Sequence, residues 1–361
     1  MNQFKRSRWA WQVGSLFGIS IRIHVTLFAL LVWIAIATPI SGVGTQQSFA
    51  QWSLVVAVFA CILAHELSHA LVARRFGCST REILLLPIGG IAQMERMPQR
   101  PAQELLVAIV GPATNLAIAA VLGATIWIAG WSVGPEQPAF LRALLVPLFW
   151  SNVALAAFNL VPAFPMDGGR ILRAVMATRL TRLRATRIAT VVGKLLAAAF
   201  VLGGLGGGHV MLTVIGLFVW FAAERESATV TLSTLLSKST VADAMIKQPH
   251  VVDVDTSIER AVERMLAEGQ RELAVADHGR ITGVVTVADL SERVAAAPPH
   301  GSVGAAMHRD LLVVEPTTAL DTVLEPIEKR GAVLVGDEQA IVGLLTGEQL
   351  ATFAALHRSS L

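Results

Sequence analysis

The sequence predicts a polytopic α-helical membrane domain of about six transmembrane helices, followed by a cytoplasmic pair of smaller α/β modules. The chain of 361 residues is 54% hydrophobic and only 15% charged, and most of its apolar residues fall between positions 20 and 223. Lys and Arg gather in alternate connections between the apolar segments. Residues 239–361 have an ordinary mixed composition and contain an internal repeat. A membrane domain with an attached soluble region follows from these observations.

Each expected span is an apolar run close to the roughly 20 residues that a helix needs to cross the hydrocarbon core. The last two runs are short and interrupted by glycine, so their ends are less sharply defined than those of the others. We expect spans at approximately 24–40, 52–73, 105–129, 140–161, 188–205 and 210–223.

Positive charge orients these spans. Basic residues, beginning with Lys5, Arg6 and Arg8, precede the first span and also separate the second from the third and the fourth from the fifth. The connections 41–51, 130–139 and 206–209 contain no Lys or Arg. The positive-inside rule therefore places both termini and the C-terminal modules in the cytoplasm. We expect the membrane to be a bacterial inner or plasma membrane. A formal charge of +3 is too small to suggest a nucleic-acid partner.

Two histidines lie in the second apolar span, where polar side chains are costly and therefore point to function. His65 and His69 are one helical turn apart on the same face, a spacing that suits two imidazoles on one metal ion, with Glu66 beside them as a base. A hydrolytic zinc site takes three protein ligands and a water. Asp167, at a Pro/Gly-rich break after the fourth span, is the candidate third ligand. Its alternatives are a helix cap and a partner for Arg170.

Two further features lie near these residues in the predicted topology. Asn115, within the third span, either holds a substrate carbonyl or oxyanion or makes a helix–helix hydrogen bond. The apolar segment 83–92 is too short to span and contains Pro-Gly-Gly. We interpret it as a hairpin or re-entrant loop beside the site, because unpaired backbone is tolerated at membrane depth only under protein or beside water. An exposed strand there would pair with an extended peptide.

The repeat in the C-terminal region joins two copies of about 60 residues. Val241–Met245 is echoed by Val303–Met307, and Gly283–Thr286 by Gly343–Thr346. Each copy reads helix, strand, turn, strand, helix, and a breaker cluster at 298–301 joins them. We therefore expect four regions: a membrane core at 1–225, a linker at 226–238, a first module at 239–298 and a second at 299–361.

The membrane core resembles the site-2 protease family of intramembrane zinc metalloproteases over about residues 10–225. The matching motifs are His65-Glu66-Leu67-Ser68-His69, Gly111-Pro112-Ala113-Thr114-Asn115 and Asn159 through Gly169. The resemblance implies that His65, His69 and Asp167 hold one zinc ion while Glu66 activates water. It also implies that the substrate is a membrane protein, cut in or near a transmembrane helix during regulated intramembrane proteolysis in the lipid bilayer. Met166 stands where the family usually has Leu, a conservative apolar change.

The C-terminal repeat resembles a pair of CBS modules, as in the branch of the family that carries them. This resemblance implies an adenine nucleotide, because Gly283-x-x-Thr286-x-x-Asp289 is similar to the ribose-contacting pattern. The second copy has Thr346 but Gln349 where Asp is expected, which favours one nucleotide site over two. Such pairs often associate face to face, so the oligomeric states that the sequence leaves open include a homodimer through these modules. The alternative is a pairing domain without a ligand.

A different function class, a CBS-regulated metal or ion transporter, shares the layout of a membrane domain followed by paired modules. Two features favour the protease. A metal relay has no need for Glu66 next to His65, and the expected spans lack a chain of further carboxylates.

Overall fold

The computed structural model describes residues 9–40, 44–87, 89–94, 98, 100–128, 139–269, 271–287, 289–291, 301–309, 311–337 and 341–357. The described residues form two compact units, one within Phe4–Ala228 and one within Thr229–Leu361. Three sequence expectations lie outside the described residues: the basic residues before position 9, most of the 130–139 connection, and the junction of the two modules at 298–299.

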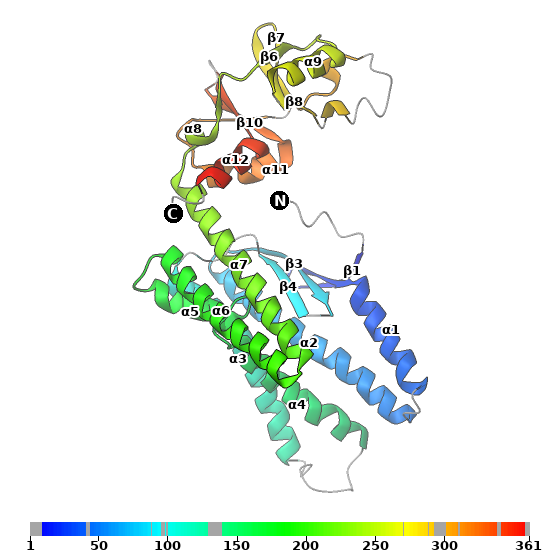
Figure 1. Cartoon of the computed structure of the whole chain (residues 1–361). Coiled ribbons are helices and arrows are strands. Elements are labelled where there is room, and N and C mark those ends of the chain that lie inside the picture. Colours follow the sequence, from blue (N-terminus) through cyan, green and yellow to red (C-terminus); the bar gives the residue numbers. More distant parts are fainter. Residues whose placement is uncertain are drawn as a thin grey trace. The chain divides into compact units, whose positions relative to one another are not determined.

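The first unit is a bundle of helices topped by a small sheet (Figure 1). Its helices are α1 (Val25–Ile40), α2 (Thr45–Arg75), α3 (Pro101–Ile128), α4 (Ala139–Asn159), α5 (Asp167–Ala177), α6 (Arg182–Gly207) and α7 (Val210–Lys238). Helices α2, α3 and α4 pack against one another, and α5 packs between α3 and α6. Helix α7 begins in this unit and continues without interruption through the expected linker 226–238.

Among the described residues, four helices are long and apolar enough to cross a membrane: Thr45–Arg75, Pro101–Ile128, Phe140–Asn159 and Arg182–Gly207. The expected first span is helix α1, which has 16 residues and is short for a full crossing. The expected last span is the apolar first half of α7, and charged residues from Glu224 onward follow it in the same helix. The membrane domain is thus helical with four candidate spans, a smaller number than the six expected.

The sheet of the first unit contains β1 (Ala10–Leu16), β2 (Ile19–His24), β3 (Thr80–Leu86) and β4 (Gly89–Met94) in that spatial order. Strand β2 pairs in parallel with β3, and β3 forms an antiparallel hairpin with β4. Alternate residues of β2 and β3 point into the bundle, because side chains of a strand alternate between its faces. Ile19, Ile83 and Leu85 pack there with Leu27 of α1 and Ala70 of α2. The segment 83–92 is therefore a hairpin, and β4 is an edge strand.

The second unit contains two similar modules. The first has the sheet β6 (Val251–Asp253), β7 (Glu272–Asp277) and β8 (Arg280–Thr286) with α9 (Ile258–Glu268); the second has β9 (Leu312–Val314), β10 (Ala332–Gly336) and β11 (Ile341–Thr346) with α11 (Leu324–Arg330) and α12 (Gly347–His357). In each module a parallel strand pair is followed by an antiparallel hairpin.

The repeated motifs join the two modules reciprocally. Strand β5 (Ile246–Lys247), which follows Met245 of the first copy, pairs with β11 of the second. His308, which follows Met307 of the second copy, pairs with Val284 of the first. The repeated glycines make room for the methionines, because a Cβ at Gly283 or Gly343 would lie 2.6 Å from the sulfur of Met307 or Met245 respectively. Each copy therefore contributes a backbone pairing and a methionine to the sheet of the other copy.

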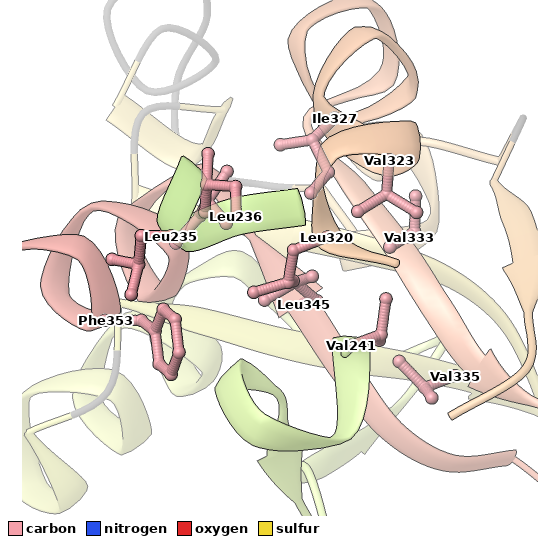
Figure 2. Packing of buried hydrophobic residues seen from close by; sticks show 11 residues of the cluster. Leu235, Leu236, Val241, Leu320, Val323, Ile327, Val333, Val335, Leu345 and Phe353 are labelled. Carbon is pink, nitrogen blue, oxygen red and sulfur yellow. The ribbon is translucent and has the colours of Figure 1, made fainter. Parts of the chain in front are cut away.

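A buried apolar cluster forms the core of the second module and includes the end of α7 (Figure 2). Leu235 and Leu236 of α7 pack with Val241, Leu320 and Leu345. The last part of the expected linker therefore belongs to the core of the second unit.

Candidate metal centre

The two histidines lie on the buried face of α2, a helix of 31 residues. His65 and His69 are 6% and 3% exposed, so both imidazoles are withdrawn from solvent. Their Nε2 atoms are 3.1 Å apart, as expected for side chains one turn apart on one helix face.

Asp167 approaches this pair from a different helix. The chain turns after α4, and Asp167 is the first residue of α5. Its Oδ2 lies 3.2 Å from Nε2 of His65 and 3.1 Å from Nε2 of His69. The structure thus brings together the three residues that the sequence predicts as ligands.

The hydrogen bonds behind the imidazoles determine which ring atoms face the aspartate. Nδ1 of His65 is 2.6 Å from Oδ1 of Asn115, and Nδ1 of His69 is 2.6 Å from the carbonyl oxygen of Val107. Both partners are acceptors, so each neutral ring carries its proton on Nδ1 and a lone pair on Nε2. Two nitrogen lone pairs and a carboxylate oxygen then converge with no proton between them, an arrangement that a bound cation stabilises.

The donor set suits zinc. Two imidazole nitrogens and one carboxylate oxygen, all within 4.8 Å of one another, make a set of three protein ligands that leaves a fourth position for water or substrate. This is the one such cluster of potential ligands found among the described residues.

Helix α3 forms the wall behind the two histidines and comes close to them at Gly111. A Cβ there would lie 2.2 Å from Nε2 of His69 and 2.7 Å from Cε1 of His65. Val107, Gly111 and Asn115 follow at intervals of four residues, so they share one face of α3. On this face, the Val107 carbonyl and the Asn115 side chain accept hydrogen bonds from the two histidines, and Gly111 between them leaves room for the imidazole rings.

Glu66 lines a cavity of about 810 Å³ that also contains the three candidate ligands. Most of the cavity wall is apolar and comes from α2 and α4, and strand β4 lines it with residues 89–92. Arg170, one turn after Asp167 on α5, also faces this cavity. The cavity therefore has room for a peptide segment beside a carboxylate that is not needed as a ligand.

Asn115 lines the same cavity, but its amide is largely engaged within the protein. Its Oδ1 accepts from His65, and its Nδ2 donates to Oδ1 of Asn152 on α4 at 2.9 Å. The structure therefore contains the helix–helix hydrogen bond that was the alternative to a substrate contact. The substrate or oxyanion role of Asn115 stays a prediction.

Sequence reasoning missed two groups of buried polar residues. Asn152 is fully buried, and the signal for it was an amide within an apolar span. Arg173, expected only as a topology charge, is 1% exposed and pairs with Glu104 of α3 at 2.5 Å and Glu226 of α7 at 2.5 Å. An acidic residue at the start of a membrane span was the available signal for this ion pair.

In the first module, the expected nucleotide residues contact each other. Oδ2 of Asp289 accepts from the backbone nitrogen and the hydroxyl of Thr286, both at 2.8 Å, and its Oδ1 lies 2.9 Å from Nε2 of His308. A ribose would have to exchange with some of these bonds. A cavity of about 550 Å³ lies beside the corresponding residues of the second copy, where Gln349, Arg271 and Asp243 line it.

In the second copy, Oε1 of Gln349 takes the place of the Asp289 carboxylate and accepts from the backbone nitrogen of Thr346 at 3.1 Å. Glu272 of β7 lies next to both residues. The Thr346 hydroxyl donates to Oε1 of Glu272 at 2.5 Å, and Nε2 of Gln349 donates to Oε2 of Glu272 at 2.9 Å. Burial raises the pKa of Glu272 above its usual value, although these two hydrogen bonds act in the opposite direction. Gln349 thus has a structural partner within the module pair.

The chain matches two family models, Peptidase family M50 over residues 53–138 and 135–202, and CBS domain over residues 241–296. A zinc metalloprotease of Methanocaldococcus jannaschii is 31% identical over 92% of this chain and 92% of its own length. The Mycobacterium tuberculosis protein Rip3 is 33% identical over 97% of this chain and 94% of its own. A solved site-2 protease from Methanocaldococcus jannaschii is 35% identical, covering 61% of this chain and 95% of that one, with a TM-score of 0.44.

Proposed function

The chain belongs to peptidase family M50, the site-2 proteases, and we propose that it cleaves membrane-protein substrates with His65, His69 and Asp167 as zinc ligands and Glu66 as general base. The observation that supports the ligand assignment is the convergence of three acceptor atoms within 4.8 Å of one another. The relatives named as zinc metalloproteases favour this function over the transporter.

Zinc at this position supplies Lewis-acid chemistry and lowers the pKa of a bound water towards about 7. The Glu66 carboxylate accepts a proton from the attacking water and later delivers it to the leaving amine nitrogen. Asn115 and the Val107 carbonyl hold the two imidazoles so that their Nε2 atoms face Asp167. The wall of the cavity around Glu66 is mostly apolar, which strengthens the electrostatic interactions between these polar groups and the reacting atoms.

The proposed substrate is a transmembrane helix that unwinds locally. Its backbone carbonyls are occupied by intrahelical bonds, so attack requires an extended segment. Strand β4 is the edge of its sheet and lines the catalytic cavity, which supports pairing of that segment with β4.

Comparative membrane proteomics of cells with the native protein and with Glu66→Gln tests the activity. Substrates are expected to persist as uncut membrane proteins in the variant, while the metal content of the purified protein stays close to native. Cleavage at a comparable rate by Glu66→Gln would contradict the role of Glu66. Ion flux without cleavage by either protein would favour the transporter.

Topology is the second part of the proposal. We propose six crossings, with α1 and the first half of α7 added to the four long helices, because both segments are apolar and carry exposed hydrophobic side chains. The distribution of Lys and Arg supports cytoplasmic termini and a cytoplasmic module pair in a bacterial plasma membrane. The test is to place single cysteines at residues 206–209 and label them with a thiol reagent that does not cross the membrane. Labelling of intact cells is expected if this connection lies outside the cytoplasm.

The module pair is proposed to bind an adenine nucleotide and to change the proteolytic rate. The arrangement of Thr286, the last residue of strand β8, with Asp289 supports a ribose site, provided that the sugar replaces His308 as the partner of Asp289. Regulation further requires that the nucleotide bind the active and inactive states unequally. Calorimetry of the purified chain with ATP, ADP and AMP, with Asp289→Ala as control, is the test. If no nucleotide binds at millimolar concentration, the module pair is a pairing domain without a ligand.

A homodimer through the module pair is proposed from the resemblance to paired modules. Light scattering of the detergent-solubilised chain measures its mass, and loss of dimer in a chain that ends at position 238 would assign the contact to the modules.

A further inference from the structure

Three buried polar side chains from three helices form one hydrogen-bonded series in the membrane core. Asn152 of α4 accepts from Asn115 of α3 at 2.9 Å, and Asn115 in turn accepts from His65 of α2 at 2.6 Å. Asn152 is 0% exposed and Asn115 is 1% exposed. Such a series is costly in an apolar bundle unless every member is satisfied.

The direction of each hydrogen bond follows from its neighbour. Nδ2 of Asn152 donates to the carbonyl oxygen of Leu148 at 2.9 Å and to the sulfur of Cys61 at 3.4 Å. Its Oδ1 must therefore face Asn115, whose Nδ2 donates to it. The Oδ1 of Asn115 is then left for the Nδ1 proton of His65. A flip of either amide would bring two donors or two acceptors together.

The two histidines are held in different ways. Nδ1 of His69 donates directly to a backbone carbonyl, that of Val107, which its own helix fixes in place. His65 donates instead to the Asn115 side chain, which has free torsions and is held by Asn152. The orientation of His65 thus depends on a residue that does not touch it.

We propose that Asn152 is a positioning residue for the metal centre: acting through Asn115, it fixes the tautomer and ring orientation of His65. The proposal rests on the proposed zinc site. Partners behind a metal-ligating histidine commonly change metal affinity by about 10- to 100-fold. A purely structural Asn152 would instead only join helices, as amides do in membranes.

Zinc affinity of the full chain in detergent, measured by competition with a chelator, tests this proposal. Asn152→Leu keeps the number of side-chain heavy atoms but removes all three hydrogen bonds of the amide, and should weaken zinc binding by about 10- to 100-fold. Asn152→Asp, in its neutral form, keeps an acceptor for Asn115 and a donor for Leu148, and should bind zinc within about threefold of native. Thr114→Val, which removes only a bond to the Val110 carbonyl within α3, is the matched control and should bind as native does.

A second measurement separates positioning from helix joining. If Asn152 acts through Asn115, the double variant Asn152→Leu/Asn115→Ala should lose no more affinity than Asn115→Ala alone. The cobalt-loaded Asn152→Leu protein should also show a shifted ligand-field spectrum. Native affinity and spectrum in Asn152→Leu, or additive losses in the double variant, would overturn the proposal. Absence of zinc binding by the native chain would instead overturn the proposed function.

Discussion

Arg173 is the place where a single substitution should most damage the membrane core. Its guanidinium is 2% exposed and lies 2.5 Å from Oε1 of Glu104, which is equally buried. It also contacts Glu226 and stands 5.1 Å from the ring centre of Phe164, in the turn that leads to Asp167. Replacement by methionine keeps much of the volume but leaves the carboxylate of Glu104 without its main partner.

The structure sets the magnitude of the loss. Breaking a buried ion pair from one side costs about 3–5 kcal/mol, because the remaining charge stays in a medium that solvates it poorly. Arg182 approaches Oε2 of Glu104 at 3.3 Å and compensates in part, so the lower value applies. Arg173→Met should therefore cost about 3 kcal/mol, or roughly 100-fold in the unfolding equilibrium. Glu226, whose side chain is 31% exposed, contributes less, and Glu226→Gln should cost below about 1 kcal/mol.

Unfolding in mixed micelles of increasing SDS content, followed by tryptophan fluorescence, measures these free energies. The exposed Arg184 of α6 offers the matched control, and Arg184→Met should stay within about 0.5 kcal/mol of native. The double variant Arg173→Met/Glu104→Leu removes both charges and should recover most of the loss. Equal stabilities of Arg173→Met and Arg184→Met, or no recovery in the double variant, would refute the assignment.

Three further outcomes are expected. Burial raises the pKa of Glu272 in the folded state, so ionisation of this carboxyl costs stability as the pH rises from its unfolded-state pKa through its folded-state pKa. Glu272→Gln should therefore increase the hydrogen-exchange protection of β7 and β11 at pH 7 but not below about pH 4. Unchanged protection at both pH values would contradict this. His65→Ala and Asp167→Asn should each remove most of the zinc measured by metal analysis, and zinc retained by the double variant would place the site elsewhere. Gly343→Ala should destabilise the module pair by about 1–3 kcal/mol in thermal unfolding, whereas Gly347→Ala, with 3.7 Å to the nearest neighbouring atom, should not.

Local spacing made the metal centre predictable. His65 and His69 are one turn apart in a single helix, so their common face follows from the period of that helix. Asp167 is not local to them, and it could be named only because zinc needs a third ligand and because the motif resembles that of a known family. The hydrogen bonds behind the rings were not predictable, since they depend on the rotation of α3 and α4 relative to α2.

The membrane boundary was predicted less well, for a physical reason. Hydropathy measures whether a segment tolerates lipid, and α1 and the start of α7 do tolerate it by composition. The length of a crossing depends also on where the helix stops, and α1 has only 16 residues while α7 continues into charged sequence. The repeat in the second unit was more informative, because the paired glycines and methionines of the two copies contact one another.

Helix α3 is the element on which the geometry of all three candidate ligands depends. It supplies the Val107 carbonyl to His69 and the Asn115 side chain to His65. At its first turn, Glu104 holds Arg173 of α5, the helix that begins with Asp167. A displacement of α4 would reach His65 through Asn152, whereas a displacement of α3 would disturb the hydrogen-bond partners of both histidines and, through Glu104 and Arg173, the helix that begins with Asp167. Sensitivity of zinc affinity to substitutions should therefore be greatest along the buried face of α3.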